Sequence, residues 1–147
     1  MTTLLWIICI LIALWLLFRG GNSKAVMADL PGPGTYLLDV VGESNYQEAL
    51  YEIVGERTDE SAEFYTKAEL HIENNNKYDK NAVRVDIDGH TVGYLSRENA
   101  RLYRKELKRL GQANLSPIGC DAVIRGGWVR DESDKGMFGV KLDLPIS

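Results

Sequence analysis

Cysteine and histidine are nearly absent from this chain of 147 residues. One of the two cysteines, Cys9, lies inside an apolar run, so no intrachain disulfide with Cys120 is expected. The two histidines, His71 and His90, do not combine with Cys120 into the short spacings of a zinc site. We therefore expect neither a disulfide framework nor a bound metal.

The sequence also lacks the motifs on which most enzymes depend. It contains no glycine-rich phosphate-binding loop, and no serine or cysteine is arranged with histidine as in nucleophilic catalysis. The acidic residues form no pattern that indicates a paired general acid and base. We expect a protein that is not an enzyme and that uses no cofactor.

A long apolar run is present at the N-terminus. Residues 2–18 contain no charge, proline or glycine, and as a helix they would extend about 26 Å, the short end of what crosses a bilayer. Trp6 and Trp15 lie near the two ends of this run, where tryptophan anchors a helix at the membrane interface. The pattern predicts one transmembrane helix at residues 2–18.

A cleaved signal peptide is the alternative interpretation of this run. The residues "VMA", which end at Ala28, fit the small-residue cleavage rule, but no basic residue precedes the run, and Arg19 and Lys24 fall between the run and Ala28. An uncleaved anchor explains these positions better. Because Arg19 and Lys24 directly follow the predicted span, we expect a single-pass membrane protein with its C-terminal domain in the cytoplasm.

The residues after the predicted anchor divide into a tether and a domain. Residues 19–35 are rich in glycine, proline, serine and asparagine, so they are predicted to be a flexible tether. The folded domain is predicted at residues 36–145.

Strand and helix patterns alternate in the first half of this domain. "TYLLDVVG" predicts a strand, and "SNYQEALYEIVG" predicts a helix with Ser44 as its N-cap and Gln47 as the capping-box partner. Residues 56–65 are predicted to be a charged loop. "KAELHIEN" and "AVRVDIDGHTVGYL" then alternate as strands do, the second around a hairpin turn at Asp88 and Gly89.

The second half adds one helix and two strands. "SRENARLYRKELKRLG" predicts a helix that begins after Ser96 and ends at Gly111, and "CDAVIRGGWV" and "MFGVKLDL" predict strands. Together these patterns predict a mostly β, α+β domain, in which five or six strands form a small, strongly bent sheet or barrel with two helices at its edges.

The charge of the chain is unevenly distributed. With 17 Lys and Arg against 21 Asp and Glu, the net charge of −4 does not favour nucleic-acid binding by bulk attraction. The second predicted helix nevertheless carries a basic stripe at helical spacing, formed by Arg97, Arg101, Lys105 and Lys108. Such a stripe is a solvated helix face, a contact for nucleic-acid phosphates, or a contact for anionic lipid headgroups.

Two stretches of the domain, "NNNKYDKNAVRV" and "GHTVGYLSRENA", resemble the HIRAN family. The family's pattern of Asn-x-Tyr-Asp-x-Asn-Ala, a strand, Val-Gly-x-Leu and a helix falls on Asn76, Tyr78, Asp79, Asn81, Ala82, Val92, Gly93 and Leu95. The resemblance spans about residues 36–145. It implies a fold similar to an oligonucleotide-binding barrel, and capture of the 3′ end of single-stranded DNA.

The resemblance also implies roles for individual residues. Tyr78 would stack on the terminal base, and Asp79 would accept a hydrogen bond from a free 3′-hydroxyl and repel a phosphate. Asn76 would shape or line the pocket, and Phe138 would be a further stacking aromatic. Separately from the resemblance, the basic stripe of the helix predicts Arg97, Arg101 and Lys105 as contacts for the nucleic acid.

Other roles for these residues remain open. Asn76, Asp79 and Asn81 have side chains that commonly hydrogen-bond the backbone of their own loop, and Tyr78 or Phe138 could pack against the barrel. Trp128 is either a second stacking platform or a packed hairpin residue.

The first strand departs from the family pattern. Residues 38–41 read "LDVV", whereas DNA-binding members carry aromatic residues and an arginine on this strand. The alternative function is therefore a protein-interaction module that keeps the fold but has lost DNA binding. In that case, the charged helix and residues 56–65 would dock a cytoplasmic protein partner.

Overall fold

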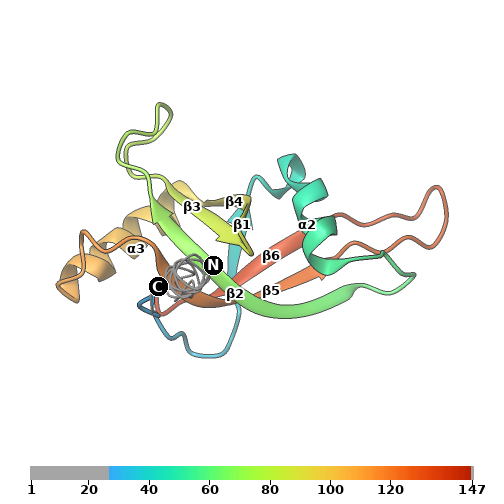
Figure 1. The fold of residues 1–147 in the computed structure, drawn as a ribbon, viewed down its shortest axis with the longest axis horizontal. Coiled ribbons are helices and arrows are strands. Elements are labelled where there is room, and N and C mark those ends of the chain that lie inside the picture. Colours follow the sequence, from blue (N-terminus) through green and yellow to red (C-terminus); the bar gives the residue numbers. More distant parts are fainter. Residues whose placement is uncertain (1–26, 147) are drawn as a thin grey trace, which may run out of the picture.

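The computed structural model describes residues 27–146, and within them six strands form one closed antiparallel barrel. The strands are β1 (Leu38–Val41), β2 (Ala62–Ile72), β3 (Val83–Ile87), β4 (His90–Leu95), β5 (Ile118–Gly126) and β6 (Phe138–Asp143). They pair in the order β1-β4-β3-β2-β5-β6, and β6 pairs with β1 to close the barrel (Figure 1). The predicted barrel is thus confirmed, with the larger of the two expected strand numbers.

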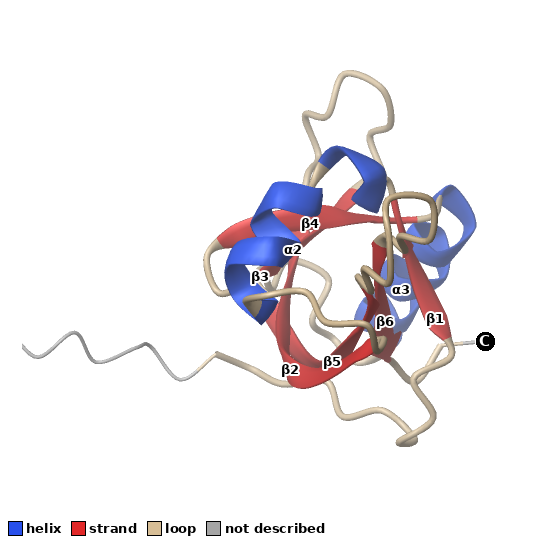
Figure 2. Cartoon of the chain, turned by 90° about the vertical axis from the view of Figure 1, so that its right-hand side faces the viewer, coloured by secondary structure: helices blue, strands red, loops and turns tan. Residues whose placement is uncertain are grey.

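Two helices and one short helical turn accompany the strands in the described part of the chain. They are the turn η1 (Glu43–Asn45) and the helices α2 (Gln47–Val54) and α3 (Arg97–Arg109). The view along the barrel shows the strands as a ring with α2 at the near end and α3 farther back (Figure 2). The two helices therefore lie toward opposite ends of the barrel, as Figure 1 also shows.

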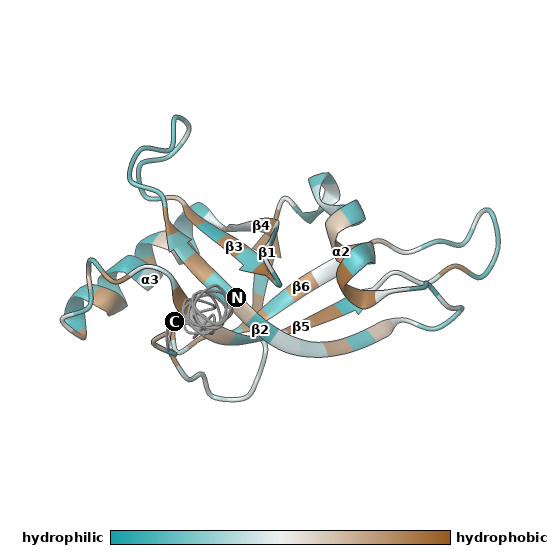
Figure 3. Cartoon of the chain, viewed as in Figure 1, coloured by the Kyte–Doolittle hydropathy of each residue, from teal (hydrophilic) through white to brown (hydrophobic). Residues whose placement is uncertain are grey.

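Branched aliphatic side chains fill the barrel. Val83, Val85 and Ile87 of β3 are fully buried, and Tyr103 and Leu107 of α3 are fully buried against the same core. Burial of such side chains is the main force that closes a small sheet on itself. Coloured by hydropathy, α3 and the loops are largely hydrophilic, while hydrophobic residues recur along the strands (Figure 3).

The local signals for the β3–β4 turn and for α3 are confirmed. Asp88 and Gly89 both have positive φ angles, 49° and 77°, which is the backbone of a tight two-residue hairpin turn. The Ser96 hydroxyl accepts a 3.1 Å hydrogen bond from the Asn99 N–H at the start of α3. Beyond the other end of the helix, Gly111 adopts the left-handed conformation, with a φ of 72°.

Two predictions on the β1–β2 segment are wrong. Ser44 does not cap a helix, because it lies inside η1, and α2 follows Tyr46 without a side-chain cap. Residues 56–65 are not a continuous loop, because β2 begins at Ala62 and pairs with β5 as far as Gly126. The charged composition of this segment predicted a loop, but its strand residues pair with residues of β5 more than fifty positions away. Local sequence patterns do not reveal such long-range pairing.

Residues that precede the predicted start of the domain, at residue 36, also contact the barrel. The Leu30 N–H donates to Gly119 O at 2.9 Å, the Gly119 N–H donates to Ala28 O at 2.8 Å, and Leu30 is buried. Farther along, the buried Asp143 carboxylate accepts hydrogen bonds of 2.8 to 2.9 Å from the N–H groups of Gly34 and Thr35. Four residues of the predicted tether are therefore hydrogen-bonded to the barrel: Ala28, Leu30, Gly34 and Thr35.

The predicted anchor, residues 2–18, and the first residues of the predicted tether lie outside the described residues. Within residues 27–146, no helix has the length and hydrophobicity needed to cross a membrane.

Candidate nucleic-acid interface

The loop that joins β2 to β3, residues 73–82, is organised by its own polar side chains. The Asn76 side-chain oxygen accepts hydrogen bonds from the N–H groups of Tyr78, at 2.9 Å, and Asp79, at 3.1 Å. One carboxylate oxygen of Asp79 accepts from the Asn81 N–H at 2.9 Å, and the Asp79 carbonyl accepts from the Ala82 N–H at 3.0 Å. Asn76 and Asp79 therefore form the turns that the sequence left open as their alternative role.

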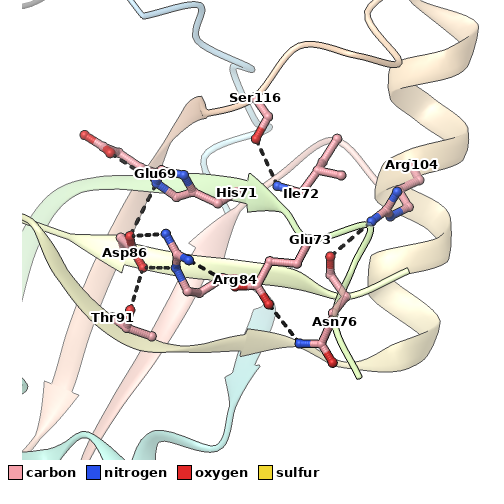
Figure 4. A network of polar contacts seen from close by, with 11 residues as sticks. Glu69, His71, Ile72, Glu73, Asn76, Arg84, Asp86, Thr91, Arg104 and Ser116 are labelled. Atoms are coloured by element: carbon pink, nitrogen blue, oxygen red, sulfur yellow. Dashed lines mark hydrogen bonds and ion pairs between the residues drawn. The ribbon is translucent and has the colours of Figure 1, made fainter. Parts of the chain in front are cut away.

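A chain of charged groups connects this loop to the barrel wall (Figure 4). The Asn76 amide donates to Glu73 at 2.8 Å, and Glu73 also accepts from Arg84 at 3.0 Å. Arg84 in turn donates to Asp86 through Nε at 2.9 Å and Nη2 at 3.0 Å, and the Thr91 hydroxyl donates to Asp86 at 3.0 Å. Asn76 is thus connected through Glu73 to Arg84 and Asp86 of β3, and through Asp86 to Thr91 of β4.

The hydrogen bonds in this chain control the ionisation of Asp86. Burial by itself would raise the pKa of this carboxyl group, but the hydrogen bonds from Arg84 and Thr91 and the positive charge of Arg84 act against it. The net result is that the pKa of Asp86 lies below its ordinary value. Asp86 therefore stays ionised at neutral pH and holds Arg84 in position.

A second attachment of the loop comes from α3. Arg104 points from the helix toward the loop (Figure 4) and donates hydrogen bonds to three backbone carbonyls and to the side chain of Asn74. Arg104 is not part of the predicted basic stripe. No local pattern distinguishes it from the other basic residues of the helix.

A hollow of about 420 Å³ lies beside the loop, between residues 76–79, the end of β4 and the start of α3. We call it the tyrosine pocket. Of the seven predicted site residues it brings together Asn76, Tyr78, Asp79 and Arg97, and the others that line it are Tyr46, Lys77, Ala82, Tyr94 and Leu95.

Tyr46 and Tyr94 are site residues that the sequence analysis missed. Tyr46 follows η1, where the chain leaves β1 through a left-handed Gly42 with a φ of 84°. Tyr94 lies on β4 opposite Val41 of β1 and next to the Leu95 of the family pattern. Burial and the nearby charge of Glu73 raise the pKa of Tyr94, so its hydroxyl stays protonated at neutral pH.

Each polar and aromatic group of the tyrosine pocket has a distinct chemical capacity. The Tyr78 side chain is 77% exposed, and the Lys77 ammonium lies 4.8 Å from the centre of its ring. Among residues 27–146, the second carboxylate oxygen of Asp79 accepts no hydrogen bond, so it is free to accept one from a ligand. The pocket therefore combines exposed aromatic surface, one acceptor carboxylate and the guanidinium of Arg97.

Phe138 lies elsewhere. This residue is only 2% exposed, its ring lies 5.1 Å from the guanidinium carbon of Arg57, and it lines a different hollow of about 230 Å³ together with Arg57 and Gly127. The structure therefore does not bring Phe138 to the tyrosine pocket, and its role as a stacking residue stays a prediction. Phe138 has the core role that the sequence left open.

The residues of the predicted basic stripe do not all line the tyrosine pocket. Arg97 lines the tyrosine pocket, and Arg101 follows one turn later with an exposed side chain. Lys105 instead lines a hollow with Leu102 and Ile146 near the C-terminus. The structure thus brings Arg97 to the pocket, whereas Arg101 and Lys105, one and two turns farther along α3, do not line it.

Trp128, the other candidate platform, is a packed residue of the β5–β6 connection. Its indole N–H donates to Asp134 at 2.9 Å, and the Arg130 guanidinium carbon lies 5.6 Å from the centre of its ring. These contacts stabilise the connection itself and do not direct the ring toward the tyrosine pocket.

Comparison with protein families gives a match to the model described as HIRAN domain over residues 41–113. Residues 41–113 are a HIRAN domain. The match begins at the last residue of β1 and ends after α3, so it contains every residue that lines the tyrosine pocket. It is shorter than the predicted range of 36–145, and β5 and β6, which complete the barrel, lie outside the matched residues.

HIRAN domains are in general DNA-end-binding modules. No curated protein and no solved structure matches the chain. Because HIRAN domains in general bind DNA ends, a DNA end is the ligand to test in the tyrosine pocket.

Proposed function

We propose that this HIRAN domain binds the 3′ end of single-stranded DNA in the tyrosine pocket. The observation that carries the proposal is the convergence of three tyrosines, Tyr46, Tyr78 and Tyr94, around the Asp79 carboxylate and the Arg97 guanidinium. The first strand lacks the aromatic residues expected of a DNA-binding member, and Tyr46 and Tyr94 supply aromatic surface from two other segments.

The proposed division of labour follows from the groups themselves. An exposed tyrosine ring stacks on a base of any sequence, which in single-strand binders contributes about 1 to 3 kcal/mol per base. The free oxygen of Asp79 accepts a hydrogen bond from a 3′-hydroxyl, whereas a 3′-phosphate would bring a second negative charge to the same place. Arg97 provides a positive charge for the phosphate that precedes the terminal nucleotide.

The proposal is tested by measuring the affinity of the full chain, kept in solution with a mild nonionic detergent, for short single-stranded DNA. Fluorescence anisotropy compares an oligonucleotide of about 10 nucleotides that ends in a 3′-hydroxyl with the same oligonucleotide that ends in a 3′-phosphate. We expect tighter binding of the hydroxyl end. Asp79→Asn should remove that preference, and Tyr78→Ala should weaken binding of both ends by about tenfold.

Asp88→Asn provides a matched control for the Asp79 variant. The change in charge and shape is the same, but Asp88 is an exposed residue of the β3–β4 turn, and asparagine tolerates its positive φ of 49°. This variant should keep the preference for the hydroxyl end. Equal affinity of the two ends for the unmodified chain would contradict the proposal. No binding of either end at low salt would favour a protein-interaction module instead.

We also propose, from the sequence of residues 2–18, that the domain is held at a membrane with its C-terminal part in the cytoplasm. Extraction of cell membranes with alkaline carbonate tests the anchor, because a membrane-spanning helix stays in the pellet. Vesicles with and without anionic lipid test whether Arg101 and Lys105 contact headgroups: Arg101→Ala and Lys105→Ala should weaken binding to the anionic vesicles alone.

A further inference from the structure

The guanidinium of Arg104 is hydrogen-bonded almost entirely to the loop that carries Tyr78 and Asp79. Its Nε donates to the carbonyl of Asn81 at 2.8 Å, and its Nη2 donates to the carbonyls of Lys80 and Ala82, each at 3.2 Å. Its Nη1 donates to the Asn74 side chain at 2.8 Å. One side chain of α3 thus holds both sides of the loop, residue 74 on one and residues 80–82 on the other.

Two of the three peptide groups that accept hydrogen bonds from Arg104 also donate hydrogen bonds to Asp79. The Lys80–Asn81 peptide accepts from Arg104 at its carbonyl, and its N–H donates to the Asp79 carboxylate at 2.9 Å. The Asn81–Ala82 peptide accepts from Arg104 as well, and its N–H donates to the Asp79 carbonyl at 3.0 Å. Two successive peptide groups therefore bridge Arg104 and Asp79.

The effect of this bridge runs from Arg104 to Asp79, and Arg104 itself is fixed to the barrel. A cation at the carbonyl side of a peptide polarises it, which strengthens the hydrogen bond that its N–H donates on the other side. Arg104 itself is carried by α3, and the neighbouring Tyr103 is fully buried in the core. The barrel thus determines where the Asp79 carboxylate lies, through Arg104 and two peptide groups.

We propose that Arg104 is a positioning residue for end recognition: it sets the orientation of the Asp79 carboxylate in the tyrosine pocket, and with it the preference for a 3′-hydroxyl. This inference rests on the proposed function. It assigns to Arg104 no contact with DNA, which separates it from Arg97 in the pocket and from Arg101 on the exposed face.

The inference predicts a loss of discrimination rather than a loss of charge. An arginine that only attracted phosphates would, when removed, weaken the binding of both DNA ends by the same factor. Arg104 acts on a carboxylate that distinguishes the two ends, so its removal should lower the affinity for the hydroxyl end and change the affinity for the phosphate end much less. Lysine should not replace it, because one ammonium group cannot span four acceptors on both sides of the loop.

The experiment compares Arg104→Lys, Arg104→Ala and the matched variant Arg101→Ala in the full chain, again in detergent solution. The ratio of dissociation constants for the 3′-phosphate and 3′-hydroxyl oligonucleotides is the readout, with thermal unfolding measured in parallel. For Arg104→Lys, which keeps the charge, we expect the hydroxyl end to bind about tenfold more weakly and the ratio to approach one. Arg101→Ala should weaken both ends equally and keep the ratio of the unmodified chain.

Amide hydrogen exchange provides a second readout that does not depend on DNA. The N–H groups of Asn81 and Ala82 should exchange faster in both Arg104 variants than in Arg101→Ala, because their acceptor in Asp79 is no longer held. If the unmodified chain prefers the hydroxyl end and Arg104→Lys keeps the full preference, the inference is overturned while the proposed function stands. If the unmodified chain shows no preference, the proposed function itself fails, and the inference fails with it.

Discussion

The side chain of Gln47 and the backbone of Phe138 exchange two hydrogen bonds. The Gln47 amide nitrogen donates to the Phe138 carbonyl at 2.9 Å, and its oxygen accepts from the Phe138 N–H at 2.8 Å. Gln47 is the first residue of α2, and Phe138 is the first residue of β6. The start of α2, with the adjacent Tyr46, is therefore attached to the barrel by a pairing that resembles one step of a strand ladder.

Replacement of this glutamine tests the attachment. We expect Gln47→Ala to lower the free energy of unfolding by about 1 to 3 kcal/mol, because two partly buried backbone groups lose their partners. Urea denaturation measures the change. Gln47→Glu keeps the shape and one acceptor but cannot donate to the Phe138 carbonyl, so an intermediate loss is expected. A Gln47→Ala protein as stable as the unmodified chain would show that the pairing contributes nothing.

The two tyrosines that the sequence did not indicate should matter to DNA binding through their rings. We expect Tyr46→Leu and Tyr94→Leu each to weaken binding of a 3′-hydroxyl oligonucleotide by about tenfold, the effect of losing one stacking surface. Tyr46→Phe and Tyr94→Phe keep the ring and serve as controls with near-normal affinity. Loss of binding in the phenylalanine variants as well would mean that the hydroxyl groups, and not the rings, are the contacts.

The segment before β1 should depend on Asp143. This buried carboxylate accepts hydrogen bonds from the N–H groups of Gly34 and Thr35, so Asp143→Ala should destabilise the fold by about 1 to 3 kcal/mol. It should also release the segment around residue 34 for cleavage by a protease. Asp39→Ala, which breaks only a solvent-exposed ion pair with Lys141, should change stability by less than about 1 kcal/mol and leave that segment protected.

Stability should depend on pH through Asp86. Its pKa is lower in the folded chain than in the unfolded one, so the unfolded chain binds the proton more tightly. The stability from this group is therefore fully present above its ordinary pKa, near pH 4, and is lost as the pH falls through the lower folded-state value. Asp86→Asn should be less stable at pH 7, and its urea midpoint should fall less between about pH 5 and pH 2. Parallel curves for the two proteins would contradict this account.

The parts of the fold that sequence predicted well have short-range causes. The Asp88-Gly89 turn and the Ser96 cap each depend on one or two residues whose backbone or side chain decides the local structure. The family pattern likewise identified Asn76, Tyr78 and Asp79, which do meet in one pocket. Neighbouring residues and a shared motif were sufficient in these cases.

The parts that sequence missed depend on contacts between distant segments. Tyr46 reaches the pocket because Gly42 turns the chain away from β1 and Gln47 attaches α2 to β6. Arg104 resembles its basic neighbours in sequence, and only the packing of α3 against the barrel directs it to the loop. No periodicity or local propensity carries this information, because it arises from the tertiary arrangement.

Gly93 has a consequence for the meaning of the family signature. A methyl group at this position would lie 2.5 Å from a methyl carbon of Val40 and 2.6 Å from the carbonyl oxygen of Val41, so any side chain would force β1 and β4 apart. The glycine of Val-Gly-x-Leu is thus a requirement of barrel closure, and this requirement does not depend on the ligand. The Val-Gly-x-Leu part of the pattern therefore reflects the close packing of β1 against β4. The nature of the ligand has to be inferred from Asn76, Tyr78 and Asp79.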